Sequence, residues 1–308
     1  MYGIPEYRLP KDVVRKEVKK IEALGVTFIT QCMVGQAITV DNMFEQGFDA
    51  VFIGSGTALP KSLDTPGYTL RGVTQSSYFL RMASLCNTGS IGREEVPVKE
   101  GDIVGVIGGG NVAMDAARTA LRMGAGKVYV LFRRTMDQMS ALQTEYNEAV
   151  EEGVEFLWET TVTEFIGSNG KLEKIRVKTP EGENFMPIDR ILLAIGSRPA
   201  NRIVSTTSGI KVDDTGYVIT KERPYGMTTR KGVFAGGDVV HTPQTVVLAM
   251  KEAKQVAKGI AQFVDAKKLL EEAGWVDSDN DGIREKDGIK CRVWTMRKLQ
   301  RNWTQERT

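Results

Sequence analysis

The sequence contains few of the residues that build metal centres or activated nucleophiles. Its 308 residues include one histidine, His241, and three cysteines, Cys32, Cys86 and Cys291. The cysteines are far apart and form no C-x-x-C pair, which argues against a redox-active dithiol or a cysteine-bound cluster within this chain. No G-x-S-x-G or H-E-x-x-H pattern accompanies the histidine, so we name no catalytic side chain and no metal site. The chemistry is therefore expected to come from bound cofactors.

Long apolar runs and a strong charge of one sign are also lacking. No run approaches the ~18 apolar residues that cross a bilayer, and the opening five residues have neither the basic nor the apolar region of a signal peptide. The net charge of +2 gives no reason to expect nucleic acid or a membrane as a partner. We therefore expect a cytoplasmic protein, and its length predicts about two domains.

Apolar periodicity predicts an α/β protein in which strands alternate with helices. The predicted helices are 11–24, 40–46, 75–86, 111–123, 138–152 and 245–264. The predicted strands are 26–30, 48–53, 102–107, 127–132, 155–158, 161–166, 172–178, 190–194, 217–220 and 232–235. Residues 265–308 differ in character, being charged at first and without sustained periodicity after Gly288, and we treat them as an atypical tail.

A glycine-rich turn joins strand 102–107 to helix 111–123. The turn reads G-x-G-x-x-A, and this strand–turn–helix context is the one in which that pattern binds dinucleotides. Its first glycine permits a tight turn, its third lets the backbone approach a pyrophosphate, and the free amides of the helix N-terminus then face the phosphates. The candidate binding residues are Gly108, Gly109, Gly110, Asn111 and Val112.

The end of the following strand indicates which dinucleotide binds. NAD-specific sites place an acidic residue there to hold the ribose 2′-hydroxyl, whereas this chain has Arg133 and Arg134. A guanidinium matches a phosphate in charge and in fork geometry, so the pair favours NADPH. The alternative is a tight strand–helix turn that carries two solvated arginines.

Four segments resemble the small (beta) subunit of glutamate synthase and its relatives. These relatives include the NADPH-binding subunits of ferredoxin-linked transhydrogenases and dihydropyrimidine dehydrogenase. The similar segments are 3–11 (GIPEYRLPK), 49–56 (DAVFIGSG), 107–118 (IGGGNVAMDAAR) and 233–238 (VFAGGD). The resemblance extends from residue 1 to about residue 264.

This resemblance implies two Rossmann-like dinucleotide-binding domains, with an NADPH domain inserted in an FAD domain. Residues 1–66 and 195–264 would belong to the FAD domain and 67–194 to the NADPH domain. Asp238 would accept a hydrogen bond from the ribityl chain of the flavin, and amides at the start of the next helix would stabilise the reduced ring. The further cofactor-binding residues expected from the family are Gly54, Ser55, Gly56, Gly196, Gly237, Asp238, Thr245 and Val246. The alternative for residues 236–238 is an ordinary turn.

The family also carries a first G-x-G-x-x-G, which binds the ADP half of FAD, and an iron–sulfur region before the segment that matches residues 3–11. We therefore expect an incomplete FAD domain in this chain. Either an amino-terminal or an iron–sulfur or large-subunit partner polypeptide supplies the rest, or the chain is a fragment with little activity alone.

The implied activity is hydride transfer from NADPH to FAD, in an electron-entry component like the glutamate synthase small subunit. The alternatives are an NADPH–ferredoxin or pyrimidine-reducing subunit of the same group, or a non-enzymatic NADPH-binding fragment.

The tail resembles a stretch of periplasmic oligopeptide-binding proteins. Asp277, Asp279 and Asp281 have the spacing of a calcium loop, but the twelfth position is Gly288 where an EF-hand requires a bidentate glutamate. We therefore predict a solvated acidic turn there.

Overall fold

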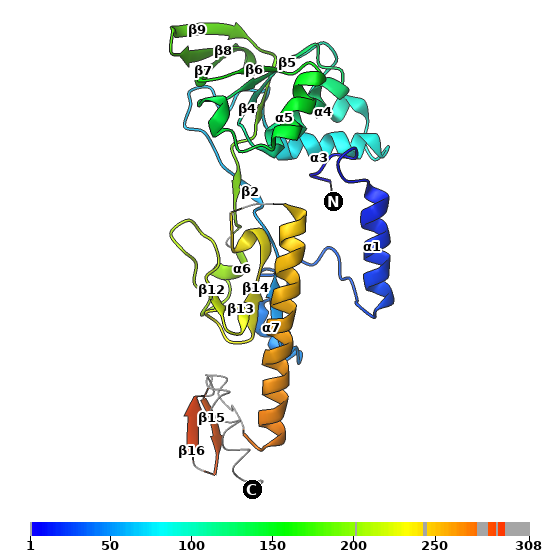
Figure 1. Cartoon of the computed structure of the whole chain (residues 1–308), viewed down its shortest axis with the longest axis vertical. Coiled ribbons are helices and arrows are strands. Elements are labelled where there is room, and N and C mark those ends of the chain that lie inside the picture. The colour runs from blue at the N-terminus through cyan, green and yellow to red at the C-terminus, as the bar shows by residue number, and fades with distance from the viewer. Residues whose placement is uncertain (1, 201, 243–244, 276–282, 288, 293–308) are drawn as a thin grey trace. The chain divides into compact units, whose positions relative to one another are not determined.

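The chain is divided into two compact units that are built around separate sheets (Figure 1). The structure, a computed structural model, describes residues 2–200, 202–242, 245–275, 283–287 and 289–292. The first unit contains Met1–Ile29 and Pro60–Ser197, and the second contains Thr30–Leu59 and Arg198–Thr308.

The first unit contains a parallel sheet of five strands in the order β3-β10-β4-β5-β6. Every neighbouring pair in this sheet is parallel. The strands are β3 (Val73–Gln75), β4 (Ile103–Ile107), β5 (Lys127–Leu131), β6 (Glu155–Leu157) and β10 (Arg190–Leu193). The helices of this unit are α1 (Lys11–Ala23), α3 (Ser76–Asn87), α4 (Asn111–Arg122) and α5 (Gln143–Glu151), with 3-10 turns η1 (Arg93–Glu95) and η2 (Met136–Gln138).

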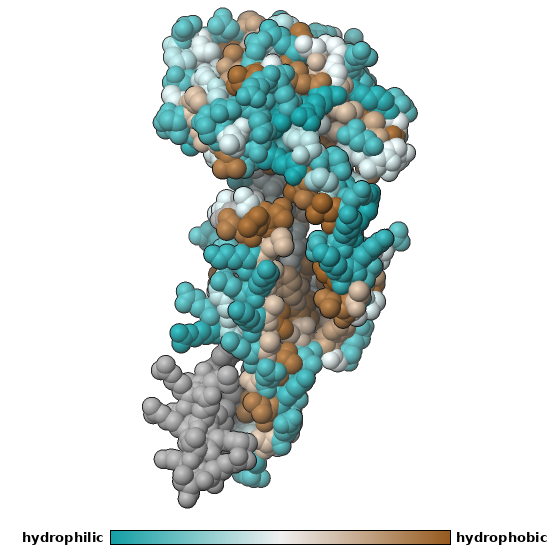
Figure 2. Space-filling model, turned by 45° about the vertical axis from the view of Figure 1, so that its right-hand side comes forward, coloured by the Kyte–Doolittle hydropathy of each residue, from teal (hydrophilic) through white to brown (hydrophobic). Residues whose placement is uncertain are grey.

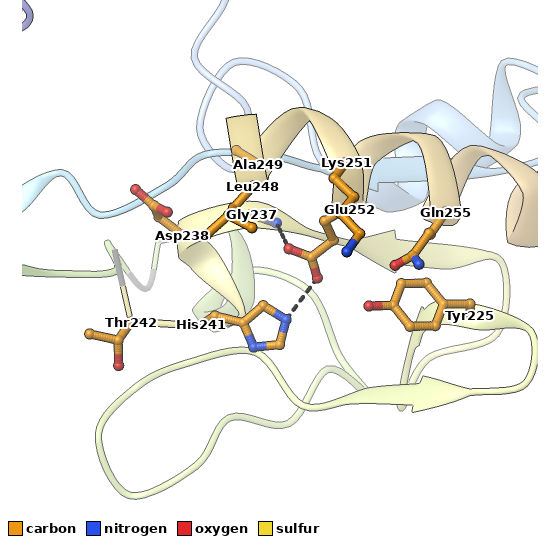
Figure 3. A pocket seen from close by; sticks show the side chains of 10 residues that line it. All are labelled: Tyr225, Gly237, Asp238, His241, Thr242, Leu248, Ala249, Lys251, Glu252 and Gln255. Atoms are coloured by element: carbon orange, nitrogen blue, oxygen red, sulfur yellow. Dashed lines mark hydrogen bonds and ion pairs between the residues drawn. The ribbon is translucent and has the colours of Figure 1, made fainter. Parts of the chain in front are cut away.

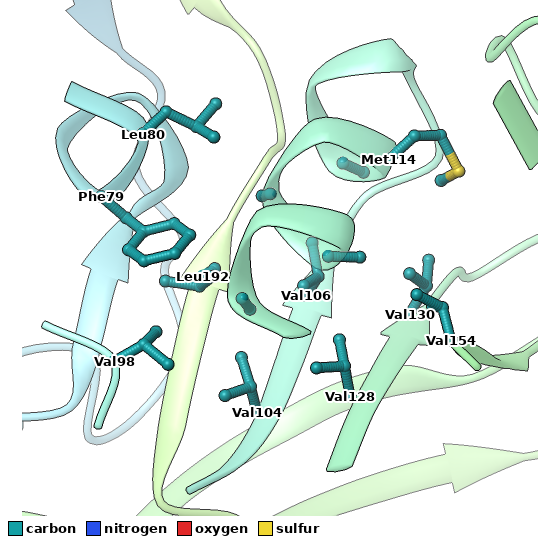
Figure 4. Close-up of a cluster of buried hydrophobic side chains, with 14 of the residues drawn as sticks. Phe79, Leu80, Val98, Val104, Val106, Met114, Val128, Val130, Val154 and Leu192 are labelled. Carbon is teal, nitrogen blue, oxygen red and sulfur yellow. The ribbon is translucent and has the colours of Figure 1, made fainter. Parts of the chain in front are cut away.

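Small side chains let α4 pack closely against this sheet. Its buried face is built largely from alanines, namely Ala113, Ala116, Ala117 and Ala120. They lie in one apolar cluster with the buried valines of β4 and β5 and with Phe79 of α3 (Figure 4). Because burial of such a face stabilises a helix more than its intrinsic propensity does, this cluster fixes the position of the α4 N-terminus at the edge of the sheet.

A small antiparallel sheet covers other apolar residues of the parallel sheet. It consists of β7 (Thr161–Ser168), β8 (Lys171–Thr179) and β9 (Gly182–Pro187). Phe165, Leu172 and Ile175 of this layer share a buried cluster with Leu131 and Ile191. The sequence pattern did not reveal β9 because its side chains are almost all exposed and lack the alternation of a half-buried strand.

The second unit contains a mixed sheet in the order β1-β14-β13-β12. The parallel pair is β1 (Val51–Ile53) and β14 (Val233–Ala235), and the antiparallel additions are β13 (Tyr225–Thr228) and β12 (Thr220–Glu222). Its helical segments are α2 (Val40–Glu45), α6 (Arg202–Ser205), η3 (Gly237–Val239) and α7 (Val246–Glu272), and its remaining hairpin is β15 (Ile283–Lys286) with β16 (Ile289–Arg292). Strands β2 (Leu59–Pro60) and β11 (Ser197–Arg198) pair with each other where the chain passes between the units.

One face of the mixed sheet is packed under α7. Met227 and Phe234 are fully buried and lie in one apolar cluster with Val256 of that helix. The aromatic ring of Phe263 meets that of Phe234 edge to face at 5.7 Å between centroids. The strand that carries residues 233–235 is therefore held against the helix that follows it in sequence.

Four predicted elements differ from the structure. Residues 26–30 form no strand: their apolar side chains are exposed and no described strand pairs with them. The helix predicted at 138–152 begins only at Gln143, because residues 140–142 are engaged by the glycine turn. The predicted strand 217–220 is replaced by β12, and α7 continues past residue 264 to Glu272. The calcium-like spacing at 277–281 lies outside the described residues.

Among the described helices, none combines the length and apolarity that a bilayer crossing requires. In Figure 2 the visible face of the first unit is mostly polar, with apolar residues scattered over it. The exposed apolar residues of the second unit include a run at the start of α7, namely Val246, Val247, Leu248 and Met250.

Candidate functional site

The glycine turn lies at the carboxyl end of β4 and has little space for side chains. Gly108 has φ +142°, and a Cβ atom there would lie 2.4 Å from the carbonyl oxygen of Ala194. A Cβ atom on Gly109 would lie 2.5 Å from the ring of Phe132. Gly110 is the N-cap of α4, and no side chain caps that helix. The first two glycines are thus required by the packing of the turn, and the third begins the helix.

The turn lies where the strand order of the parallel sheet reverses. From β4 the chain passes through α4 to β5 on one side, whereas the strand on the other side, β10, comes much later in the sequence. The amide of Ala194, just after β10, donates to Ile107 at the end of β4 over 2.8 Å. The crevice beyond the carboxyl ends of strands at such a reversal is where open α/β sheets bind ligands.

A short segment before α5 fixes the conformation of the glycine turn. The amides of Ser140 and Ala141 both donate to the carbonyl oxygen of Gly109, each over 3.0 Å. The side-chain oxygen of Asn111 accepts from the amide of Leu142 over 3.0 Å. Asn111 was predicted to bind the cofactor. Its side chain joins the glycine turn to the segment before α5.

The first amides of α4 are left for an external acceptor. No described residue accepts a hydrogen bond from the backbone N–H of Asn111 or Val112. These groups carry the partial positive charge of the helix N-terminus. The arrangement suits an anion such as a pyrophosphate.

Arg133 and Arg134 follow β5 at the same edge of the sheet. Both side chains are exposed, and neither forms a hydrogen bond or ion pair with any described residue. The backbone around them is fixed, because Phe132 accepts from the amide of Thr160 over 3.0 Å and Arg134 from that of Glu159 over 3.1 Å. Two free guanidinium groups thus lie on a rigid turn beside the glycine turn.

Aromatic rings support this edge from behind. The ring of Phe132 meets that of Trp158 edge to face at 6.2 Å, and Trp158 stacks on Phe156 at 5.4 Å. Tyr146 of α5 meets Phe156 at 4.7 Å. Because Phe132 also contacts Gly109, the rings connect the glycine turn with α5 and β6.

The opening segment clamps the buried face of α4 to α5. Arg8 forms an ion pair with Asp115 at 2.7 Å and hydrogen-bonds Glu145 through its Nη1 at 2.6 Å. Tyr7 lies under two guanidinium groups of α4, at 4.6 Å from Arg118 and 3.9 Å from Arg122. We call Tyr7, Arg8 and the buried Lys11 the amino-terminal clamp; Lys11 hydrogen-bonds the carbonyl oxygens of Ile4 and Leu9.

Burial shifts the ionisation of two groups in this contact. It raises the pKa of the Tyr7 phenol to about 12, and the charge of Asp115 adds to that shift. The pKa of Asp115 is also raised by burial, against the opposing effect of Arg8. These groups are engaged in contacts of the opening segment with α4, so we assign them a structural role.

In the second unit, two glycine-containing turns lie at one edge of the sheet. They follow β1 and β14, which are parallel neighbours, and the amide of Gly236 donates to the carbonyl oxygen of Ile53 over 3.3 Å. Gly56 has φ +63° and Gly237 has φ +73°, conformations that favour glycine. The predicted residues 54–56 and 237–238 are therefore brought together by the parallel pairing.

The N-terminus of α7 follows the second of these turns. Thr245 caps the helix by accepting from the amide of Leu248 over 3.4 Å. No described residue accepts from the amides of Val246 and Val247. A second helix N-terminus with free donors thus follows a glycine turn, as in the first unit.

A hollow of about 280 Å³ lies between α7, η3 and β13 (Figure 3). It is lined by Tyr225, Gly237, Asp238, His241, Thr242, Leu248, Ala249, Lys251, Glu252 and Gln255. In the figure, the Glu252 carboxylate points between the backbone of Gly237 and the ring of His241. Sequence reasoning missed Glu252 and Tyr225, because neither belongs to a turn motif and only the packing of α7 on the sheet brings them to the turn.

Gly196 lies two residues after Ala194, whose carbonyl oxygen faces Gly108. It follows β10, has φ +92°, and its carbonyl oxygen accepts from the amide of Lys61 over 3.0 Å. Its nearest environment in the structure is thus the paired segments that link the units. A cofactor contact for Gly196 stays a prediction.

Comparison with protein-family models gives one match that covers most of the chain. The model described as pyridine nucleotide-disulphide oxidoreductase matches residues 6–253. This range includes both glycine turns, the arginine pair and the N-terminus of α7.

Several curated proteins of similar sequence are components of NADPH-linked or NADP-linked enzymes by name. The chain is 33% identical to a glutamate synthase [NADPH] small chain of Halomonas elongata, over 86% of this chain and 60% of that protein. It is 34% identical to an NADP(+)-dependent formate dehydrogenase subunit beta of Moorella thermoacetica, over 85% of this chain and 38% of that protein. The chain thus spans less than two thirds of the length of each of these two relatives.

Among solved structures, Mycobacterium tuberculosis FprA in complex with NADPH resembles the chain with a TM-score of 0.69. The alignment covers 88% of this chain and 75% of that one at 17% identity. At this identity the likeness establishes the fold: two dinucleotide-binding domains of mixed α/β type.

Proposed function

The chain belongs to the pyridine nucleotide-disulphide oxidoreductase family, and from that membership we propose that it is an NADPH-dependent flavin oxidoreductase. The proposed activity is electron entry: NADPH is oxidised and FAD is reduced. The names of the similar glutamate synthase small chains support this assignment.

The observation that carries the proposal is the pairing of a tight glycine turn with two unpartnered guanidinium groups. The turn leaves the amides of Asn111 and Val112 free for a pyrophosphate, and Gly110 has no Cβ to obstruct its approach. Arg133 and Arg134 have no described partner, so a 2′-phosphate would meet two fork-shaped donors without displacing an existing ion pair. The donor set therefore suits NADPH better than NADH.

The second unit fits a flavin in a similar way. The residues proposed to hold FAD lie at the two turns after β1 and β14, where Gly54, Ser55, Gly56, Gly237 and Asp238 lie at one sheet edge. The free amides of Val246 and Val247 would stabilise negative charge on a reduced ring. Backbone donors and glycines of this kind bind and orient a ring without taking part in bond making.

When bound, the two cofactors supply the redox chemistry, in which a hydride passes from the nicotinamide to the flavin. The protein residues contribute alignment and electrostatic stabilisation. Effective alignment of two reactants is worth several orders of magnitude in rate, so no acid or base is required. We accordingly assign no catalytic side chain.

We further propose that the chain acts with a partner polypeptide. The similar proteins are called a small chain and a subunit beta, which are terms for components of larger enzymes. In this proposal the partner accepts the electrons from the reduced flavin. Its identity, and with it the final substrate, depends on the acceptor site of that partner.

The test is anaerobic reduction of flavin by the purified chain. Protein supplied with FAD is mixed with NADPH or NADH, and loss of the visible flavin absorbance is followed. We expect reduction with NADPH, more slowly with NADH, and not in Gly108→Ala, whose Cβ would collide with the Ala194 carbonyl. Gly3→Ala is the matched control, because a Cβ there has no neighbour within 4 Å. NADPH binding without any flavin binding would instead indicate a nucleotide-binding module.

A further inference from the structure

One carboxylate in the hollow beside the second glycine turn has two hydrogen-bonding partners. Glu252 accepts from the backbone amide of Gly237 through Oε2 at 2.9 Å. Its Oε1 lies 2.8 Å from Nε2 of His241. The Glu252 side chain is 13% exposed, whereas that of His241 is 54% exposed. Glu252 is therefore the buried residue of this pair, and His241 lies between it and solvent.

The helix that carries Glu252 is held in place independently of this carboxylate. Thr245 caps its N-terminus, and Val256 is buried against the sheet. At Gly259 the helix passes so close to β13 that a Cβ atom would lie 2.2 Å from the carbonyl oxygen of Tyr225. Because these contacts hold α7 in place, the backbone that carries Glu252 is fixed. The carboxylate is therefore a fixed acceptor for the amide of the turn.

Backbone hydrogen bonds define one side of this turn, and Glu252 defines the other. Gly237 is in the left-handed region with φ +73°, and a glycine there has access to many other conformations. The carbonyl oxygen of Gly237 accepts from the amides of Val240 and His241, which forms the short η3 turn. Its N–H has Glu252 as its acceptor. Removing the carboxylate would leave the Gly237 N–H without an acceptor among the described residues.

We infer that Glu252 is a positioning residue for flavin binding, which presents the Gly237–Asp238 turn in the conformation that contacts the flavin. The inference rests on the proposed function. Glu252 holds the Gly237 N–H inward, so the adjoining Asp238 is kept at the sheet edge beside residues 54–56. His241 engages the other carboxylate oxygen of Glu252.

Variants at position 252 separate positioning from charge. Glu252→Gln keeps an oxygen that accepts from Gly237 and an amide group that donates to the His241 ring. Glu252→Ala removes both contacts. Glu272→Ala is the matched control: it makes the same change on the same helix, at an exposed residue with no described partner.

Two equilibrium titrations and one exchange measurement test the inference. We expect Glu252→Ala to weaken FAD binding about tenfold or more, while Glu252→Gln stays within about threefold of the parent, because the hydrogen bond from the Gly237 amide is lost only in the first. Hydrogen exchange of the Gly237 amide should accelerate in Glu252→Ala and not in Glu252→Gln or Glu272→Ala. NADPH affinity should be unchanged in all three, which excludes general unfolding.

The outcomes distinguish failure of the positioning role of Glu252 from failure of the proposed function. Faster exchange at Gly237 with unaltered FAD affinity would overturn the positioning role and leave the proposed function standing. An equal loss in Glu252→Gln and Glu252→Ala would show that charge matters rather than the geometry of the turn. If the parent chain binds no FAD at any concentration, the proposed function fails and the inference with it.

Discussion

Replacing the arginine pair tests the cofactor assignment most directly. In the structure, Arg133 and Arg134 lie on a backbone held by two hydrogen bonds from the turn between β6 and β7, and their guanidinium groups contact no described partner. Substituting glutamine for both should therefore leave the fold intact. The change should remove only the positive charge and the hydrogen-bond donors that the two guanidinium groups present to a ligand.

The size of the effect follows from the exposure of the two side chains. A hydrogen bond to a charged group contributes about 1.5–3 kcal/mol, and solvent screening places exposed groups at the lower end of that range. Two such contacts give about 3 kcal/mol, or roughly a 150-fold weaker binding of NADPH. NADH lacks the 2′-phosphate, so its affinity should change by less than about threefold.

Titration calorimetry with both nucleotides measures this difference. R133Q and R134Q singly should each lose about tenfold in NADPH affinity if the two contribute equally. Arg81→Gln serves as the control, since it removes an exposed guanidinium of the same unit whose described contact is the ring of Tyr78 at 5.6 Å. Equal losses for NADPH and NADH in the double variant would refute the 2′-phosphate assignment.

Three further outcomes can be checked with purified protein. Gly109→Ala should destabilise the protein by about 1–3 kcal/mol and abolish NADPH binding, because its Cβ would meet the Phe132 ring. Adding Phe132→Leu should restore part of this stability in urea melts. If stability does not recover, the packing argument is contradicted. Truncation after Gly274, beyond the end of α7, should leave NADPH affinity unchanged, and a tenfold loss in a folded truncate would place the tail in the site. The Tyr7 phenol has a pKa of about 12 in the folded chain against 10.0, so the unfolded chain loses its proton first and stability falls as pH rises from about 10 to about 12. Compared with Tyr7→Phe, the parent should lose about 1–2 kcal/mol over that range after allowance for solvent screening, and parallel urea-melt curves would show that burial does not perturb this phenol.

The dinucleotide turn was predictable because its signals are local. A strand, three glycines and a helix follow one another within residues 102–123, so the pattern can be read without knowing that Ala194 and Phe132 are what crowd the first two glycines. The arginine pair lies one strand further along, at a position set by the same βαβ geometry. Both features can therefore be predicted from neighbouring residues, without knowledge of distant contacts.

Elements without a local signal were misread. The apolar residues at 26–30 have the composition of a strand, but a strand also needs a hydrogen-bonded neighbour, and none of the described strands provides one. The exposed strand β9 shows no alternation, and only its pairing with β8 defines it. The length of α7 was underestimated because a change to charged residues at 265 was taken as the end of the helix, although lysine, leucine and glutamate all favour helix.

The sequence by itself determined the α/β class and the glycine turn, since these depend on periodicity and on neighbours within one βαβ unit. It also placed the arginine pair, which we propose distinguishes NADPH from NADH, after the second strand of that unit. Only the tertiary structure decided which distant segments meet. The clamp of residues 7–11 on α4 and the hold of Glu252 on Gly237 join groups that no periodic pattern relates. The reason is physical: a hydrogen bond or ion pair across a fold depends on where whole helices pack, and helix packing is set by the summed burial of many side chains.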